Sequence, residues 1–306
     1  MKWIDSAGVA RLADYAGLVA ALREGFRAAI ETPVRHHHDT GPATTLLLMP
    51  AWSKDWTGLK TVTVKTDNAA KGLPTIQGSY LLIDNATGAP VAMMEGGELT
   101  RRRTAAASAL AADYLARKDA SVMAVFGAGA LALHFVRAHR AVRGITKVHV
   151  VNRSRDKAEA LVAALKAEGF AAQVSAAEQA VRSADIVSCV TGSTEALVKG
   201  AWLKPGTHVD LAGAFRPTMR ETDAETVGRA TVYVDTHEGA KAEAGDLIQA
   251  EHEGTFSFAR VAGDLAALCK GEVKGRREAG EITLFKSCGT ALEDLAAAVM
   301  VYQRAG

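Results

Sequence analysis

The chain has 306 residues, of which 48% are apolar and 23% charged, and its formal net charge at pH 7 is +2. This length suffices for two domains of ordinary size, each with its own core. The charges nearly balance and no basic block is interleaved with aromatic residues, so nucleic acid is not an expected partner. No apolar run approaches the ~20 residues of a membrane span, so we expect no membrane association.

The cysteines are an odd set of three, Cys189, Cys269 and Cys288, without CxxC spacing. Such thiols fit a reducing compartment and cannot build a zinc site by themselves. The N-terminal segment carries Asp5 and Arg11 and lacks the apolar core of a signal peptide. We therefore expect free thiols and a cytoplasmic location.

Helical spacing of alanine and leucine over residues 6–31 predicts helix up to Pro33. Four strand-like segments follow, separated by turns such as the one over residues 84–88. These segments are Thr44–Met49, Leu59–Lys65, Gln77–Ile83 and Pro90–Glu95. A long helical pattern over Leu99–Arg117 then leads into the rest of the chain.

From residue 122 onward, strand-like and helical segments alternate. The candidate strands are Val122–Phe126, Lys147–Val151, Ala171–Val174, Asp185–Val190, Thr207–Leu211 and Thr231–Val234. Alternation of this kind predicts a parallel sheet with helices on both faces. Near the end, Glu281–Lys286 predicts another strand and Thr290–Gln303 a closing helix.

A glycine-rich turn joins the first of these strands to a helical segment. Gly127 permits a tight turn, and Gly129 lacks the Cβ atom that would block a pyrophosphate. The small Ala132 lets helix and strand pack closely, and the first N–H groups of the helix attract an anion. A purely structural glycine turn is the alternative. The residues expected to line a dinucleotide site here are Gly127, Ala128, Gly129, Ala130 and Leu131.

The end of the second strand, Asn152-Arg153-Ser154, indicates which dinucleotide binds. NAD sites usually have an acidic residue here to accept from the ribose 2′-hydroxyl, whereas an arginine accommodates a 2′-phosphate. A guanidinium binds phosphate in a bidentate manner, which an acidic side chain cannot do. We expect NADPH, with NADH possible; a solvated basic loop is the alternative.

The order of segments resembles the ornithine cyclodeaminase/μ-crystallin family from end to end. Besides the glycine turn, the matching stretches are Pro33–Arg35, Leu47–Ala51, Val64–Lys65, Gly72–Thr75, Leu99–Ser108, Val151–Ser154, Gly213–Glu221 and Thr283–Gly289. The resemblance implies an α/β fold, with a Rossmann-type doubly wound parallel sheet inserted into an α+β substrate and dimerisation domain. We expect residues 1–115 and 282–306 to form that domain, residues 116–281 the nucleotide domain, and the protein to be a homodimer.

The resemblance also implies roles for individual residues. Arg35, Lys65 and Arg103 match the residues that hold a substrate carboxylate, and we assign the catalytic role to Lys65. Ordinary surface charge is the alternative for Lys65 and Arg103. The other expected cofactor contacts, beyond Arg103 itself, are Thr75, Thr104, Thr191 and Ser287.

One departure from the family pattern bears on the chemistry. Cyclodeaminases of this family carry an acid/base Asp where this chain has Phe215, in Gly213-Ala214-Phe215. Because phenylalanine cannot transfer a proton, the resemblance is to the reductase branch. We expect NAD(P)H-dependent reduction of a cyclic ketimine, Δ1-pyrroline-2-carboxylate and also Δ1-piperideine-2-carboxylate, to the L-imino acid. The alternatives are reductive amination by an alanine dehydrogenase, ornithine cyclodeaminase, and a non-catalytic protein that binds NADPH and a small ligand.

The run His36-His37-His38-Asp39 invites a metal site. Adjacent residues of an extended chain point to opposite sides, so at most His36 and His38 can share a ligand. No second cluster of ligating residues accompanies them. We therefore expect a loop or strand edge here, and no metal.

Overall fold

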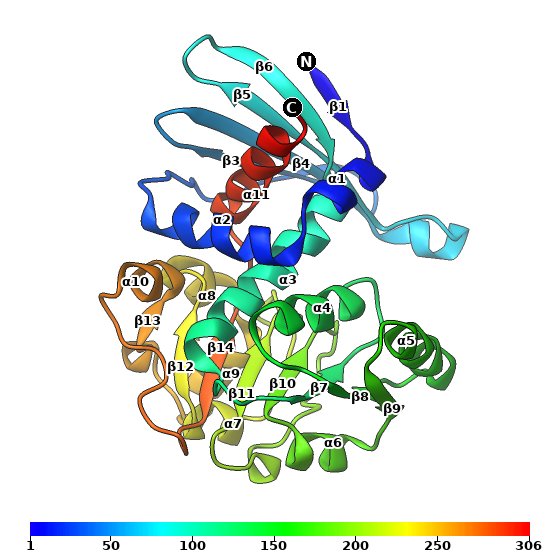
Figure 1. The fold of residues 1–306 in the computed structure, drawn as a ribbon, viewed down its shortest axis with the longest axis vertical. Helices are drawn as coiled ribbons and strands as arrows, with labels where there is room; N and C mark the ends of the chain where they lie inside the picture. The colour runs from blue at the N-terminus through cyan, green and yellow to red at the C-terminus, as the bar shows by residue number, and fades with distance from the viewer. The chain divides into compact units, whose positions relative to one another are not determined.

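The computed structural model describes residues 1–306, except for the side chain of residue 69. The chain folds as two compact units, one formed by Met1–Thr104 with Thr290–Gly306 and the other by Ala105–Gly289. We call the first the segmented unit and the second the inserted unit (Figure 1). The chain passes from one unit to the other between residues 104 and 105 and again between residues 289 and 290. The sequence predicts these boundaries at 115/116 and 281/282.

The segmented unit contains a six-stranded sheet in the order β1-β6-β5-β4-β3-β2. Its strands are β1 (Lys2–Ile4), β2 (His36–Gly41), β3 (Thr44–Trp52), β4 (Trp56–Lys65), β5 (Ile76–Asp84) and β6 (Ala89–Glu95). All neighbours are antiparallel except β1 and β6. The four predicted strands are confirmed with longer bounds. The histidine run forms the exposed edge strand β2, while β1 was not predicted.

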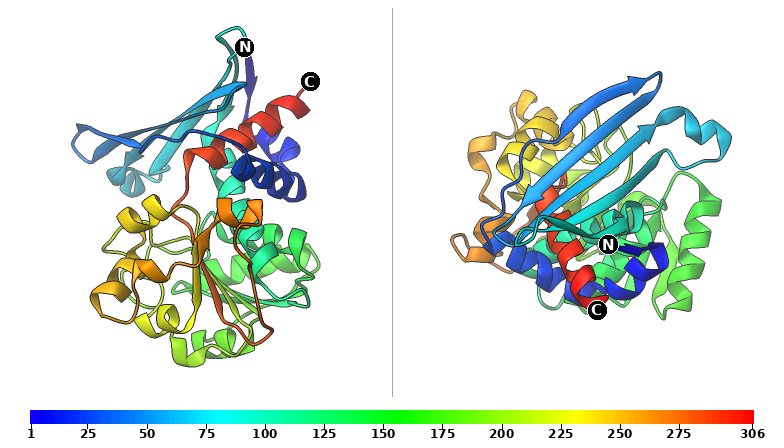
Figure 2. Two further views of the ribbon diagram at one scale, coloured as in Figure 1. Left: turned by 90° about the vertical axis from the view of Figure 1, so that its left-hand side faces the viewer. Right: turned by 90° about the horizontal axis from the view of Figure 1, so that it is seen from above.

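The first two helices of the segmented unit begin at acidic caps, Asp5 and Asp14. The expected helical stretch over residues 6–31 is two helices, α1 (Ser6–Leu12) and α2 (Tyr15–Arg27). It divides at Asp14, whose carboxylate accepts the Gly17 N–H and so starts a new helix. The closing helix α11 (Ala291–Arg304) packs against β3, β4, β5 and α2 (Figure 2).

Strand alternation gives the sheet of the segmented unit a covered and an open face. One cross-strand row is buried and lies on the side of α11: Ile4, Met94, Tyr80, Lys60 and Met49. The neighbouring row faces the other side and is half-buried or exposed: Trp3, Met93, Leu81, Leu59 and Pro50. Both rows are largely apolar, so the open face is unusually hydrophobic for a surface.

The inserted unit contains an eight-stranded sheet, parallel throughout, in the order β13-β12-β14-β11-β10-β7-β8-β9. Its strands are β7 (Val122–Phe126), β8 (Lys147–Val151), β9 (Ala171–Val174), β10 (Ile186–Cys189), β11 (His208–Leu211), β12 (Thr231–Val234), β13 (Gly263–Asp264) and β14 (Thr283–Lys286). The strand order reverses between β7 and β10, the topological switch point of a doubly wound sheet. The predicted fold class is confirmed.

Helices cover both faces of this sheet. One apolar core joins the sheet to the end of α3 (Gly96–Leu115), α4 (Ala132–Val142) and α5 (Arg155–Ala167). The other joins it to α6 (Ala177–Ser183), α7 (Ala224–Arg229), α8 (His237–Glu243) and α9 (Gly245–His252). The remaining helix is α10 (Leu265–Lys270), and short 3₁₀ turns are η1 (Thr66–Lys71), η2 (Gly200–Trp202) and η3 (Phe258–Arg260). No helix of the described residues is long and apolar enough to span a membrane.

Strand β14 differs from the expected division of the chain. Residues 282–306 were assigned to the substrate domain, but β14 pairs in parallel with β11 on one side and β12 on the other. Its Leu284 is fully buried in the core of the inserted unit. A strand buried on both faces and paired on both edges belongs to the sheet that surrounds it.

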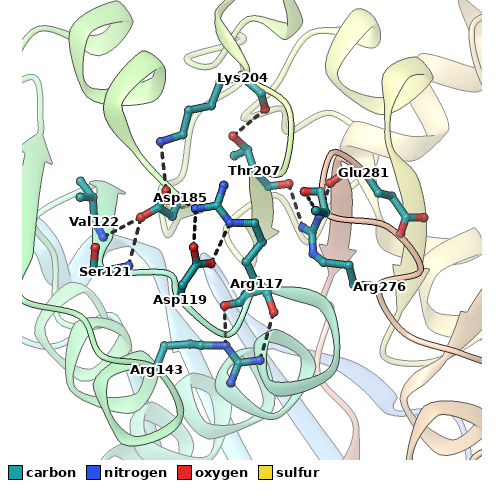
Figure 3. A network of polar contacts seen from close by, with 12 residues as sticks. Arg117, Asp119, Ser121, Val122, Arg143, Asp185, Lys204, Thr207, Arg276 and Glu281 are labelled. Atoms are coloured by element: carbon teal, nitrogen blue, oxygen red, sulfur yellow. Dashed lines mark hydrogen bonds and ion pairs between the residues drawn. The ribbon is translucent and has the colours of Figure 1, made fainter.

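Arginine side chains bind the carbonyl groups at the end of α3 and just beyond it, and Figure 3 shows Arg143 beside Arg117. Arg143 donates to the carbonyl oxygens of Ala112, Asp113, Ala116 and Arg117 at 2.7–3.1 Å. Arg276 donates to that of Leu115 at 2.7 Å. The last carbonyls of a helix have no partner within the helix, so these guanidinium groups replace a cap.

We expect Arg143→Met to lower the free energy of unfolding by about 3 kcal/mol, because it leaves several buried carbonyls without donors. Urea denaturation measures the loss. Arg182→Met is the matched control, since Arg182 makes an exposed pair with Glu178 at 2.8 Å and its loss should stay below about 0.5 kcal/mol. Equal losses in the two variants would contradict the capping role.

Candidate functional site

The glycine-rich turn follows β7 as the sequence predicts. Gly127 has φ +106°, a conformation that favours glycine. A Cβ atom on it would lie 3.0 Å from the Val190 carbonyl oxygen and 3.2 Å from the Thr191 Cγ2 atom. The turn after β7 therefore lies directly against the end of β10, at the switch point where nucleotides bind in such sheets.

The beginning of α4 is open to an anion. Its N-cap, Leu131, makes no side-chain capping hydrogen bond, so the first N–H groups of the helix have no side-chain acceptor there. A Cβ atom on Gly129 would meet nothing within 4 Å. Ala132 is fully buried against the sheet, as its small size allows. These residues fit a dinucleotide pyrophosphate, which needs backbone donors and free space beside them.

Of the polar side chains at the end of β8, three bind neighbouring residues of the chain. The Asn152 amide donates to the Ser154 carbonyl at 2.8 Å, and the Ser154 hydroxyl caps α5. Arg155 is paired with Glu159 at 2.7 Å. Arg153 is exposed. Of the two arginines, Arg153 is therefore the better candidate to bind a ribose phosphate.

A buried carboxylate connects the loops that follow β10 and β11. The Glu221 Oε1 atom accepts the N–H and the hydroxyl of Thr191, both at 2.7 Å, and its Oε2 atom accepts the Gly213 N–H at 2.8 Å. Burial raises the pKa of Glu221 to about 7, against the opposing effect of Lys286 and with a smaller contribution from Asp246. In the sequence, Glu221 ends the matching stretch Gly213–Glu221, and no motif indicates a role for it.

A second carboxylate holds the loop after β14. Asp235 accepts the N–H groups of Cys288 and Gly289, both at 2.6 Å. The Ser287 hydroxyl donates to Asp235 at 3.3 Å. Ser287, a predicted cofactor contact, is thus placed at the carboxyl end of β14 and is almost fully buried. Thr191 and Ser287 both belong to the carboxyl edge of the sheet.

In the segmented unit, four charged side chains form a buried cluster. Lys60 pairs with Asp294 at 2.6 Å. Arg103 pairs with Asp294 at 2.8 Å and with Glu293 at 2.5 Å. All four are at most 5% exposed. Arg103 is thus held rigidly by two carboxylates at the start of α11, and Thr104 follows it on α3.

Lys60 is not one of the predicted substrate-binding residues, but it lies close to two of them. Burial, together with the positive charges of Arg103 and Arg35, lowers the pKa of Lys60 to about 8 against the opposing effect of Asp294. Arg35 and Arg103 therefore lie within electrostatic range of the Lys60 ammonium group. This brings two of the three predicted carboxylate-binding residues together.

The third, Lys65, lies elsewhere. Positions 60 and 65 of β4 differ by five, an odd number, so the two side chains point to opposite faces of the sheet. The Lys65 ammonium group pairs with Asp67 at 3.1 Å and donates to the Pro42 carbonyl at 3.0 Å. Its backbone N–H donates to the Thr75 carbonyl at 2.8 Å. Of the two lysines of β4, Lys60 is the one that lies in the buried cluster with Arg103 and Asp294.

The loop after β11 carries no acidic side chain at its first positions. A side chain on Gly213 would collide with the Thr191 carbonyl and the Glu221 carboxylate. Ala214 is buried, while Phe215 is 41% exposed with the Arg216 guanidinium 5.9 Å from its ring centre. Residues 213–215 of this loop therefore expose an aromatic ring and contain no side chain that can transfer a proton.

The histidine run does not form a metal site with its surroundings. His36 and His38 lie on the exposed edge strand with their ring centres 6.3 Å apart. Among the side chains that the structure describes, no group of three or more His, Cys, Asp or Glu residues is arranged to hold a metal ion.

Known proteins share this sequence and fold along their whole length. A Δ1-pyrroline-2-carboxylate reductase of Paracoccus denitrificans is 39% identical over 90% of this chain and 88% of its own. The solved structure of Thermococcus litoralis Δ1-pyrroline-2-carboxylate reductase, in complex with NADH and L-proline, has a TM-score of 0.94 at 33% identity and covers 100% of this chain and 97% of its own.

An archaeal alanine dehydrogenase dimer with bound NAD has a TM-score of 0.93 at 32% identity, over 99% of this chain and 95% of its own. Residues 9–306 match the ornithine cyclodeaminase/mu-crystallin family. The match covers both units and both sets of residues described above. The chain belongs to the ornithine cyclodeaminase/mu-crystallin family.

Proposed function

We propose that this protein is a ketimine reductase, which transfers hydride from a reduced nicotinamide dinucleotide to Δ1-pyrroline-2-carboxylate and forms L-proline. The observation that carries this proposal is the buried Lys60–Arg103 cluster with Arg35 in electrostatic range, in a chain that has Phe215 in place of an acid. The names of the similar reductases support the same substrate class.

The charges of the cluster suit a small carboxylate. Lys60 and Arg103 face Glu293 and Asp294, and the positive charge of Arg35 lies within electrostatic range of Lys60. The hydrogen bonds described for Arg103 use its Nε and Nη1 atoms, so they leave the Nη2 edge for an incoming oxygen. A rigid guanidinium held by two carboxylates can orient a substrate carboxylate at little entropic cost.

The reaction asks little acid/base chemistry of the protein. When bound, the nicotinamide supplies the hydride, and Gly127, Gly129 and the start of α4 are the residues that would hold its pyrophosphate. A cyclic iminium arrives already protonated at nitrogen, so the site has only to orient it and stabilise its charges.

The decisive assay follows NADPH and NADH oxidation with cyclic ketimines, with pyruvate plus ammonia, and with ornithine. We expect turnover with the five-membered and six-membered ketimine carboxylates. Lys60→Met should lower kcat/KM by about 10–100-fold, since it removes a charge-assisted contact worth about 1.5–3 kcal/mol. Lys65→Met is the matched control and should change kcat/KM less than about threefold, because that ammonium group is solvated and paired with Asp67.

Thermal denaturation separates loss of folding from loss of binding in both variants. Loss of activity in Lys65→Met alone would contradict the role of Lys60 and support a catalytic role for Lys65. Conversion of ornithine to proline by the wild-type protein would overturn the reductase assignment, because it would require an acid/base group that this proposal lacks.

For the cofactor, we propose that NADPH is preferred over NADH and that Arg153 binds the 2′-phosphate. Arg153 is exposed beside the start of α5, and no acidic side chain stands at Asn152 to accept from a ribose hydroxyl. A 2′-phosphate dianion would also be favoured by the positive end of α5. The solved relatives named above contain NADH or NAD, so the preference is a property to be measured on this chain.

Arg153→Ala should weaken NADPH binding by about 10–100-fold through the loss of one charge-assisted contact. Its effect on NADH should be small. Fluorescence titration of both cofactors measures the dissociation constants. Arg155→Ala serves as the control, because Arg155 is already paired with Glu159. Equal weakening of both cofactors by Arg153→Ala would contradict phosphate recognition.

We also propose that a second copy of this chain covers the open face of the six-stranded sheet. The row from Trp3 to Pro50 is apolar and half-buried or exposed, and Trp3 itself is 61% exposed. Light scattering should give the mass of a dimer for the wild-type protein. Leu81→Glu places a charge in the middle of the row and should shift the mass toward one chain. A wild-type monomer would contradict the proposal.

A further inference from the structure

We infer that Glu221 is a positioning residue for the nicotinamide dinucleotide: its buried carboxylate fixes the loops after β10 and β11 in the arrangement that receives the cofactor. This inference rests on the proposed cofactor site at the carboxyl edge of the parallel sheet. It gives a role to a side chain that the proposed mechanism does not otherwise use.

The geometry ties three loops to one another. Glu221 accepts both the N–H and the hydroxyl of Thr191 from the loop after β10 and the N–H of Gly213 from the loop after β11. Thr191 also lies against Gly127, whose substitution would bring a Cβ atom within 3.2 Å of its methyl group. Thr191 therefore contacts both Glu221 and the glycine turn. A displacement of Thr191 would change the space in which the dinucleotide backbone lies.

The contacts require an ionised carboxylate. Three donors converge on its two oxygens, and a protonated acid or an amide would direct a hydrogen toward one of them. Glu221 is fully buried, so an unsatisfied N–H at Gly213 or Thr191 could not turn to water. Loss of the negative charge should therefore loosen at least one of the two loops.

The carboxylate is itself anchored from behind. Asp246 accepts the N–H groups of Glu221 and Thr222 at 2.7 and 2.9 Å, and its other oxygen pairs with Lys286 at 3.2 Å. Lys286 closes β14, next to Ser287. The charged and titratable groups that face Glu221 are Asp246 from α9, Lys286 from β14 and Cys189 from β10. Only the lysine opposes the negative charge of the two carboxylates.

A buried carboxylate at the opposite edge of the same sheet provides the comparison. Asp185 accepts the N–H groups of Ser121 and Val122, both at 3.0 Å, and pairs with Lys204 at 3.0 Å (Figure 3). It ties strand ends together in the same way, but before β7 and β10 begin rather than after they end. A purely structural role predicts similar consequences for removing either charge.

The test compares Glu221→Gln with Asp185→Asn. Urea denaturation first measures the free energy of unfolding of both variants. NADH binding is then titrated without urea, under conditions in which both variants are folded. We expect Glu221→Gln to raise the NADH dissociation constant about tenfold or more, since a buried donor loses its acceptor. Asp185→Asn should leave it within about twofold. Equal changes in the two variants would overturn the positioning role.

The pH profile is a readout that a merely structural role would not move. Wild-type affinity for NADH should fall as pH drops below about 7, because Glu221 then takes up a proton. NADH is the probe because its pyrophosphate does not titrate there, whereas the 2′-phosphate of NADPH has a pKa near 6. The acidic limb should disappear in Glu221→Gln. A variant that keeps the wild-type limb would contradict the inference.

If Glu221→Gln does not fold, Thr191→Val and Thr191→Ser test the same contact from its other side. Valine has the shape of threonine without the hydroxyl donor, and serine keeps the donor. We expect Thr191→Val to weaken NADH binding and Thr191→Ser to preserve it. The same affinity in both variants would contradict the positioning role of Glu221. Failure of the wild-type protein to bind NADH or NADPH would instead refute the proposed cofactor site.

Discussion

Each unit buries charged side chains, and the need to compensate these charges organises the structure. A carboxylate or ammonium group removed from water is tolerated only where partners replace its hydration. In the segmented unit, Lys60 and Arg103 face Glu293 and Asp294, so two cations meet two anions. Removing any one of the four would leave a buried charge without compensation, which costs more than the pair contributes.

The set in the inserted unit is balanced differently. Glu221 and Asp246 face one cation, Lys286, and burial raises the pKa of Glu221 from its ordinary 4.5 to about 7. Between these two values the folded chain holds a proton that the unfolded chain releases, so this group makes stability fall as pH rises. The folded protein is therefore less stable when Glu221 is ionised, which is the form that accepts hydrogen bonds from Thr191 and Gly213. Strain of this kind is typical of functional sites rather than of structural cores.

Local patterns predicted the parts of the fold that local sequence determines. The glycine turn at Gly127 and Gly129 combines strand, turn and helix within a short window, and the alternating segments after it determine the class of sheet. The place of β14 could not be predicted in this way. Its insertion between β11 and β12 depends on pairing over a long sequence separation, and nothing within residues 283–286 identifies its neighbours.

The choice between Lys60 and Lys65 shows the same limit within one strand. Both lie on β4, and alternation places them on opposite faces, but it does not tell which face a helix covers. Leu59, on the open face, is as apolar as the residues on the covered one, so hydrophobic patterning could not decide. Only the packing of α11, which brings Asp294 to Lys60, identifies the buried lysine. The available signal was a lysine in the interior of the strand rather than at its end.

The carboxylates at the carboxyl edge of the parallel sheet also explain why reduction suits this chain better than deamination. Glu221, Asp235 and Asp246 each accept at least two backbone N–H groups. A carboxylate with such duties cannot shuttle protons without releasing the loop that it holds. Among the described residues of the loop after β11, the position of a family acid is occupied by Phe215. In the proposed reaction the proton arrives with the substrate, because a preformed cyclic iminium already carries it.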